Sequence, residues 1–577
     1  MEKPISKIFT SPRMQILILL SFLLFLYFFN LNRWDLWDPD EPRYAQVAKE
    51  MVTQSRDWIL MHLNGKLYVD KPPLFFWLIG LSSYLWGGFT SFSVRFIPAL
   101  FGSLTVILTY FIGKTLFSSA VGFISGLILA TSLEFAYLST RANIDSTLTF
   151  FTTLSLLCFV LWIKIRMENH KQNNSLGGIL LFGFYVGMGL ATLTKGPVGF
   201  IIPLIVSLLF FIIQRDWNGI KGMRLFHGIL LFFAIVLPWY VPAVFLGGEV
   251  FLKETLFKHT IQRYAEGWSH SRAFYYYFLN FPLDFIPWTL FIPGALVFHL
   301  SKRKKPMDKE FLFLIIWFVS IFLFFSFSKG KRGLYLLPLY PATSIIVGSF
   351  WHAYISNRSR NDNISLGISI PIYIIAFLFF FLLFLLYLIQ SLTNSLSNPN
   401  FHLWSEVILK WLKILSQYLS YIPYNSYAPL IFGISFLSII LLFFHWLKQK
   451  VAVFFMIVLI FGVGFFWTTR FIYPEIDPYK SARLLSQEIL RIKEPKDKLA
   501  MYGGFSVGPY NYYTGIVPIL DIKSKEELVY HFQSKERIFC LIQKHEFEVL
   551  SKHLEIPLNI ITKRKVGGKE IVLVSNQ

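Results

Sequence analysis

Long apolar runs dominate the chain and are separated by short polar stretches. A run of about 17–25 apolar residues crosses the hydrocarbon core of a bilayer as one α-helix. The sequence therefore predicts a polytopic α-helical membrane protein with about 13 transmembrane helices. We place these spans at 15–30, 93–113, 120–138, 147–163, 177–194, 197–214, 226–246, 284–300, 311–328, 333–353, 366–390, 427–446 and 451–468.

The positions of the basic residues predict on which side of the membrane each loop lies. The net charge is +21, and Lys and Arg accumulate in loops on the cytoplasmic side of a membrane. The first span follows Lys3, Lys7 and Arg13, and no small-residue cleavage site follows it, so we expect an uncleaved helix that starts inside. In this orientation the loops on the outer side of the membrane are 31–92, 139–146, 195–196, 247–283, 329–332 and 391–426, and the C-terminal tail lies on the same side.

A further apolar run covers residues 74–89. Counting it as a span would put the basic cluster Lys302–Lys305 outside, against the positive-inside rule. We therefore expect 74–89 to lie in or near the outer interface. The loop 329–332 is the remaining exception, because it is strongly basic and still falls outside.

The pattern divides the chain into two parts. Residues 1–470 form the predicted transmembrane domain, with 31–92 and 247–283 as its large outer loops. Residues 471–577 read as a small soluble α/β domain. Helical spacing covers 480–493, short apolar runs follow at 498–502, 517–522 and 537–543, and two strand-like runs flank Gly567–Gly568.

The composition limits the kinds of molecule that we expect this protein to bind. The chain is 55% hydrophobic, and its basic residues are scattered among membrane segments, which argues against nucleic acid. Cys158 and Cys540 are too far apart in this topology for a disulfide, and no spacing is typical of a metal site. We expect no cofactor; a divalent metal is compatible with the acids but not indicated.

The first outer loop carries a cluster of acids: Asp38, Asp40 and Glu41, followed by Arg43 and Tyr44. Charge at a bilayer boundary is costly, so clustered acids there indicate a functional site. Helix capping by Asp40 ahead of Pro42 is the alternative, although capping needs only one acid. A carboxylate could serve a sugar transferase as general base, or could orient a phosphate acceptor.

Asp145 opens a span beside another outer loop, either as an N-cap or as a second acid that faces the first. Several cations lie on the same side. Lys71 is either a phosphate ligand or a snorkelling lysine, and Lys195 lies in a tight turn between two spans. We expect phosphate or headgroup contacts from His259, Arg263 and His270, and from Lys329, Lys331 and Arg332.

The order of these motifs resembles a known superfamily. The string Asp40-Glu41-Pro42-Arg43-Tyr44-Ala45, with Asp57-Trp58, Gly65, Tyr68 and Lys71-Pro72-Pro73, resembles the first loop of the aminoarabinose transferases that modify lipid A. More broadly it resembles the protein O-mannosyltransferase superfamily. Further motifs follow in the family's order: Arg141…Asp145, Thr194-Lys195-Gly196-Pro197, Pro238-Trp239-Tyr240, His259…Arg263 and Lys331…Tyr335…Pro338.

The resemblance implies a GT-C fold with juxtamembrane helices in the first outer loop and a polyprenyl-phosphate sugar as donor. It implies inverting transfer at the periplasmic face of the bacterial inner membrane. Asp40 is similar to the catalytic carboxylate, Glu41 stands beside it, and Asp145 resembles the second acid. Lys71 is similar to the donor-phosphate lysine, and His259, Arg263, Lys331 and Tyr335 match positions near the donor.

The acceptor stays open at this point: lipid A, another surface glycan or a protein hydroxyl. One alternative is therefore a protein O-mannosyltransferase. An alternative of another class is a transporter or flippase of lipid-linked sugars. Transporters place ionisable residues near the midplane between broken helices, whereas the predicted spans are nearly free of such groups.

Overall fold

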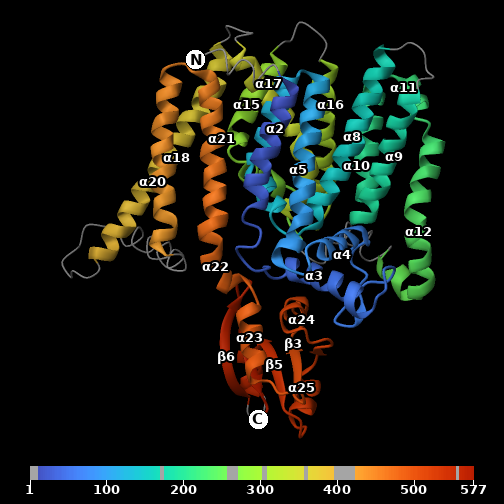
Figure 1. Cartoon of the computed structure of the whole chain (residues 1–577), viewed down its shortest axis with the longest axis vertical. Coiled ribbons are helices and arrows are strands. Elements are labelled where there is room, and N and C mark those ends of the chain that lie inside the picture. The colour runs from blue at the N-terminus through green and yellow to red at the C-terminus, as the bar shows by residue number, and fades with distance from the viewer. Residues whose placement is uncertain are drawn as a thin grey trace.

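The computed structural model describes residues 11–168, 175–255, 271–301, 308–356, 362–395, 423–553 and 558–577. A bundle of long, roughly parallel helices carries a small α/β unit at one end (Figure 1). We call this end of the bundle the domain end and the opposite one the far end. Residues 396–422 of the predicted loop 391–426, residues 256–270 of the loop 247–283 and the cluster Lys302–Lys305 lie outside the described residues.

Nine helices within the described ranges are long and apolar enough to cross a membrane. Two further pairs of helices pass together as bent spans, and three apolar helices are shorter. The long helices are α5 Ser91–Leu116, α8 Ile144–Glu168, α9 Ser175–Lys195, α12 Leu225–Leu252, α16 Lys309–Phe327, η5 Gly333–Leu339 with α17 Tyr340–Ile355, α18 Asp362–Ser395, α20 Tyr424–Trp446 and α21 Lys450–Trp467. The chain is thus a multi-pass membrane protein.

Two of the shorter helices, α2 Pro12–Leu23 with η1 Leu24–Phe28 and α10 Val198–Ile213, coincide with predicted spans. The third, α4 Leu74–Leu85, has 12 residues. At about 1.5 Å per residue it is too short for a hydrocarbon core of about 30 Å. It lies at the domain end, which agrees with the predicted interfacial helix (Figure 1). The total of 13 spans stays a prediction.

The two bent pairs differ from the straight spans that the sequence predicts. α6 Ser119–Thr131 and α7 Leu133–Ser139 meet at 72°, and α14 Tyr276–Asp284 meets the segment 288–300 (η4 Trp288–Phe291 and α15 Ile292–Leu300) at 107°. The backbone N–H of Leu133 donates to the carbonyl of Ile286 at 3.0 Å, so the two breaks are joined. Broken helices are tolerated at membrane depth where other protein groups satisfy the freed backbone.

The first outer loop folds around buried polar groups. It contains α3 Asp40–Lys49, the π-helical turn Glu50–Gln54 and a small hairpin of β1 His62–Leu63 and β2 Lys66–Leu67. The buried carboxylate of Glu50 accepts hydrogen bonds from the N–H groups of Asn64 and Gly65 at 2.8 and 3.0 Å. The turn of the hairpin is therefore fixed to the end of α3.

The C-terminal unit follows the run of α21 through α22 Tyr473–Lys480. Its five-stranded sheet has the order β4-β3-β5-β7-β6, with β3 parallel to β4 and β5, and β7 antiparallel to β5 and β6. The strands are β3 Lys498–Tyr502, β4 Leu520–Ile522, β5 Ile538–Gln543, β6 Asn559–Val566 and β7 Lys569–Ser575, where the sequence predicts apolar runs. The helices are α23 Arg483–Ile492, α24 Gly508–Thr514, α25 Lys525–Phe532 and α26 Lys544–His553.

Hydrogen bonds fix this unit to the first outer loop. The amide of Asn64 donates to the carbonyl of Ile519 at 2.8 Å and accepts from its N–H at 2.7 Å. Asn511 donates to the same Asn64 oxygen at 2.9 Å. All three atoms that bond to the side chain of Asn64 belong to the C-terminal unit, so one buried side chain couples the two parts.

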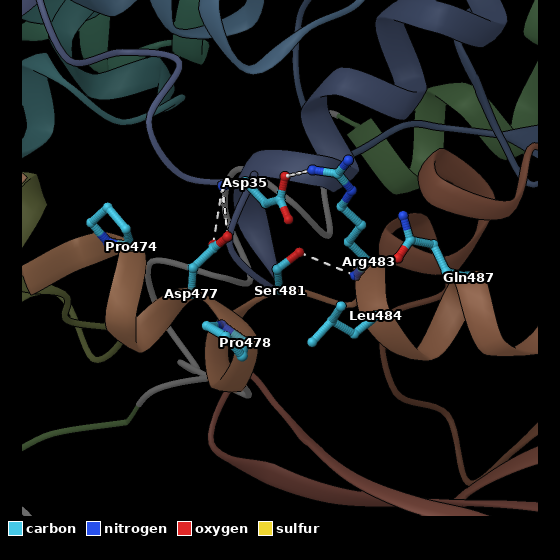
Figure 2. A pocket seen from close by; sticks show the side chains of 8 residues that line it. All are labelled: Asp35, Pro474, Asp477, Pro478, Ser481, Arg483, Leu484 and Gln487. Atoms are coloured by element: carbon cyan, nitrogen blue, oxygen red, sulfur yellow. Dashed lines mark hydrogen bonds and ion pairs between the residues drawn. The ribbon is translucent and has the colours of Figure 1, made fainter. Parts of the chain in front are cut away.

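A second contact surrounds a cavity of about 290 Å³ between the loop and the C-terminal unit (Figure 2). The backbone N–H of Asp35 donates to both carboxylate oxygens of Asp477 at 3.1 Å, and the Asp35 carboxylate pairs with Arg483 at 2.8 Å. The indole N–H of Trp37 also donates to Asp477, at 2.7 Å. The cavity is thus bordered by groups that already have partners.

A third contact involves the turn between β6 and β7. Gly567 has a φ of +60°, and a Cβ on it would lie 2.5 Å from Oδ2 of Asp38. The turn therefore packs directly on Asp38. Burial raises the pKa of Asp38 to about 6, although the charge of Lys569 opposes this. A carboxyl with such a pKa is accommodated more easily when it is neutral.

Asn64→Ala removes every bond that Asn64 makes across this interface and leaves buried backbone groups unpaired, at about 1–3 kcal/mol each. We expect a lower thermal midpoint in detergent and faster protease cleavage between the two parts. The matched control is Lys66→Ala, which breaks an exposed pair with Asp521 in the same interface. It should change little, because exposed pairs contribute about 0–1 kcal/mol. Equal effects of the two variants would contradict the assignment.

Asp38 predicts a pH dependence. Because its folded pKa lies near 6 and its ordinary value is 3.8, the folded state holds a proton that the unfolded state has lost between these values. The free energy of unfolding should therefore fall as pH rises from about 4 to about 6. Asp38→Asn removes this cost. The difference in thermal midpoint, variant minus wild type, should increase between pH 4.5 and pH 7; a constant difference would refute the cause.

Candidate functional site

Four segments bring charged side chains together at the domain end. They are the start of α3, the turn 139–144 before α8, the end of α9, and the basic loop 328–332 before η5. Two of these segments lie nearly three hundred residues apart in the chain. The bonds between them define one site.

Asp40 pairs with two arginines. Its Oδ1 pairs with Arg43 at 2.6 Å and its Oδ2 pairs with Arg332 at 2.7 Å. Burial opposes the charge of Asp40, but the guanidinium groups of Arg43 and Arg332 outweigh it, so its pKa lies below the ordinary value. Asp40 is therefore an ionised carboxylate with free lone pairs, suited to orient an acceptor or to balance developing positive charge.

Glu41 has a different environment from its neighbour. Its side chain is 1% exposed, and both oxygens pair with Arg95 at 2.8 Å. The N–H groups of Ala142 and Trp37 donate to the same carboxylate at 2.8 and 2.9 Å. This arrangement fixes the loop and does not favour the predicted catalytic role of Glu41, which stays a prediction.

Arg95 was not singled out from the sequence. It lies in the first turns of α5, is fully buried, and donates to the carbonyls of Leu31, Trp34 and Asp35 as well as to Glu41. In the sequence it cannot be distinguished from other arginines near the start of a membrane span. The fact that its partner lies 54 residues earlier cannot be read from local spacing.

Asp145, predicted as the second acid, forms a buried ion pair with Lys195. The ammonium of Lys195 also lies over the ring of Tyr335, 4.2 Å from its centroid. The predicted tight turn is present as well, because Gly196, with a φ of +78°, and Pro197 alone separate α9 from α10. Lys195, Tyr335 and Asp145 thus come from three separate helical segments and meet at one point.

The three cations of the basic loop 328–332 have different surroundings. Arg332 reaches Asp40, whereas Lys329 is exposed to the surroundings. Lys331 is buried and donates to the carbonyls of Arg272 and Ser328, and burial lowers its pKa. Its predicted phosphate contact stays a prediction that this burial does not favour.

Some of the remaining predicted residues are described by the structure, and others are not. Tyr44 is buried edge-on against Phe75 and Phe76 of α4, so it fixes α3 on that helix. Lys71 is half-buried in the turn that precedes α4. His259, Arg263 and His270 lie outside the described residues.

Two further acids were missed. Glu134 lies just after the break between α6 and α7, and Asp284 ends α14 at the other break. The signal was present, because each is a single acid within a predicted apolar run. They also weaken the argument that the spans lack ionisable groups, although both lie at breaks that face the domain end.

The arrangement suits surface chemistry on a charged substrate. Guanidinium and ammonium groups surround Asp40 and Asp145, and phosphate oxygens could compete for them. Within the described ranges, no group of three or more His, Cys, Asp and Glu side chains could hold a metal ion.

Comparisons with known proteins agree with this architecture. Residues 14–247 match the family model for dolichyl-phosphate-mannose-protein mannosyltransferases. An uncharacterised protein of Aquifex aeolicus is 30% identical over 347 residues, which is 60% of this chain and 65% of that one. The undecaprenyl phosphate-alpha-4-amino-4-deoxy-L-arabinose arabinosyl transferase of Yersinia enterocolitica is 30% identical over 337 residues, which is 58% of each chain.

These alignments span about three fifths of the relatives' length. The similarity in fold covers more of the chain than the sequence alignments do. The crystal structure of ArnT from Cupriavidus metallidurans, bound to undecaprenyl phosphate, has a TM-score of 0.74 at 19% identity, covering 97% of this chain and 98% of that one. The predicted GT-C fold is thereby confirmed. On its matched segment, its relatives and its fold, the chain is similar to membrane glycosyltransferases of the GT-C type, and it shares the fold of ArnT.

Proposed function

We propose that this protein transfers a sugar from an undecaprenyl-phosphate-type donor to an acceptor, with lipid A as the preferred acceptor class. The observation that carries the proposal is Asp40, which two arginines hold at the end of a membrane bundle. Relatives named as aminoarabinose transferases support the donor class. Transfer would invert the anomeric centre.

In this reaction the bond between the anomeric carbon and the phosphate oxygen breaks, and a bond to the acceptor oxygen forms. Polyprenyl phosphate leaves with the electron pair. Arg332 and Lys71 are the cations that we assign to that phosphate, since charge neutralisation assists a leaving group. Asp40 orients the acceptor, and it takes the proton when the acceptor is a hydroxyl. Glu41 and Asp145 act by positioning.

We place the domain end at the periplasmic face of the inner membrane. The helix connections at the far end carry Lys114, Arg215, Lys221 and Lys448, which fits the cytoplasmic side. The sugar donor and the acceptor would then both be reached from the periplasm.

One other activity has specific support. The matched family model describes protein mannosyltransferases, so a protein hydroxyl is the alternative acceptor. Mass spectrometry of lipid A, surface glycans and protein-linked hexose, with and without the gene, separates the two. Loss of a lipid A substituent supports our proposal, and loss of protein-linked hexose replaces it.

Asp40→Asn keeps the shape of the side chain but removes its charge. We expect transfer from an undecaprenyl-phosphate sugar to fall at least about 100-fold in kcat, the usual loss for a general acid or base. The control is Asp216→Asn, the same change at a far-end carboxylate that pairs with Arg166. Turnover by Asp40→Asn at the rate of the control would remove Asp40 from the mechanism.

Lys195→Met leaves the buried carboxylate of Asp145 without its partner, which costs about 3–5 kcal/mol for a buried pair. We expect a lower thermal midpoint and a large loss of activity. Adding Asp145→Asn should restore part of the midpoint, because it removes the uncompensated charge. Additive losses of the two changes would show that the pair does not act as a unit.

A further inference from the structure

A second cavity lies at the far end of the bundle, opposite the candidate site (Figure 1). Its volume is about 240 Å³, and it lies between the ends of α5, α8 and α10 and the start of α16. Sites for drug-sized ligands hold about 300–1,000 Å³. This cavity can therefore hold a headgroup and the start of a chain, but not a complete lipid.

The lining of this cavity is arranged in two layers by α8 and α16. Lys164 lies near the end of α8 with Val160 one turn deeper, and Lys309 begins α16 with Phe313 one turn deeper. Residues four apart lie on one face of a helix, about 6 Å apart along its axis. Each helix thus presents an ammonium group at the rim and an apolar side chain toward the centre of the bilayer. The same order of groups is found in a phospholipid.

Aromatic rings form much of the apolar layer. The ring of Phe313 meets that of Phe210 edge-on and stacks on that of Phe159, at centroid distances of 5.5 and 6.0 Å. Leu116 and Ile163 add aliphatic surface. Acyl carbon suits such a surface better than water does, because an apolar lining offers water no hydrogen bonds.

Three charged side chains at the rim lack a partner. In the part of the chain that the structure describes, Lys164, Lys309 and Glu310 make no side-chain hydrogen bond or ion pair. The charge of Lys309 acts on Asp216, but Arg166 already binds that carboxylate at 2.6 and 3.0 Å. Both lysines are exposed, so their ammonium groups can reach a further anion.

Local preferences explain Glu310 but not the pair of lysines. The helix dipole stabilises an acid in the first turn of a helix and disfavours a cation there, yet Lys309 precedes Glu310 at the start of α16. The positive-inside rule accounts for basic residues at this end in general. It does not require two of them to border one apolar cavity.

We propose that this cavity binds the headgroup of phosphatidylglycerol from the leaflet at the far end. The phosphate would accept hydrogen bonds from Lys164 and Lys309, and a glycerol hydroxyl would donate to Glu310. Two lysines and one glutamate give the rim a net charge of +1, which matches the single negative charge of this lipid. Phosphatidylethanolamine has no net charge, and a polyprenyl phosphate has no alcohol hydroxyl for Glu310. Basic pockets between membrane helices on the cytoplasmic side are typical sites for anionic lipids.

Three of the helices that border the cavity lead to the candidate site at their other ends. Asp145 lies in the first turn of α8, Lys195 lies just before α10, and the loop with Arg332 follows α16. A lipid that joins the far ends of these helices would stabilise the bundle that holds the site. The inference does not rest on the proposed transferase function.

The test uses the full-length protein in detergent after removal of bound lipid. Native mass spectrometry measures the binding of phosphatidylglycerol, phosphatidylethanolamine and phosphatidylmethanol, which is anionic but has no headgroup hydroxyl. The wild type should bind phosphatidylglycerol most tightly, and its thermal midpoint should rise with this lipid. Lys164→Gln with Lys309→Gln should weaken this binding about 30-fold, the effect of two lost lysine–headgroup contacts. Glu310→Ala should remove the preference for phosphatidylglycerol over phosphatidylmethanol.

The matched control is Lys221→Gln with Lys448→Gln, which removes two exposed far-end lysines outside the cavity and changes the net charge equally. It should leave the binding unchanged, and thermal midpoints without lipid show that each variant is folded. A cavity variant that binds like the wild type, or a control that weakens binding as much, overturns the site. A preference over phosphatidylmethanol that survives Glu310→Ala overturns the choice of lipid. So does displacement of phosphatidylglycerol by an equal concentration of undecaprenyl phosphate.

Discussion

The buried ion pair between Glu41 and Arg95 holds the rest of the site in place. Arg95 ties the end of the first helix to the loop by three carbonyls, and Glu41 ties the loop to Ala142. Removing one partner of a buried pair leaves an uncompensated charge, which is far costlier than the pair itself is worth. Because Glu41 is fixed, its neighbour Asp40 points from a rigid turn toward Arg332. The position of Asp40 therefore depends on the buried acid next to it in the chain.

The site is organised by charge along one segment of chain. Arg332 pairs with Asp40 and Tyr335 contacts Lys195, whereas Gly333 between them lies against the carboxylates of Asp284 and Glu134. A Cβ at this position would lie 3.0 Å from the Asp284 carboxylate, so that side chain would have to shift slightly. This alternation lets a short stretch of backbone separate a cationic from an anionic side over a few ångströms.

Much of the architecture could be predicted from the sequence. The thickness of the bilayer sets the length of each apolar run, and the sidedness of the membrane sets where basic loops occur. The strands at 559–566 and 569–575 were predicted at their bounds, and the helix that begins at residue 74 was predicted close to its bounds. The site was predicted in part. Asp40, Asp145 and Arg332 come together, but the partners that hold them are long-range and leave no local pattern. The bends beside Glu134 and Asp284 were missed since hydropathy does not detect a change of direction.

The turn at Gly567, packed on Asp38, has a consequence for biogenesis. Asp38 leaves the ribosome more than five hundred residues before that turn, and every span between them must be inserted first. The loop that carries Asp40 is therefore completed only when the last strands have been synthesised and have folded against it. Domains generally fold as units in order of synthesis. Here the earliest outer loop is finished by the latest unit, so a partly inserted chain would lack its assembled site.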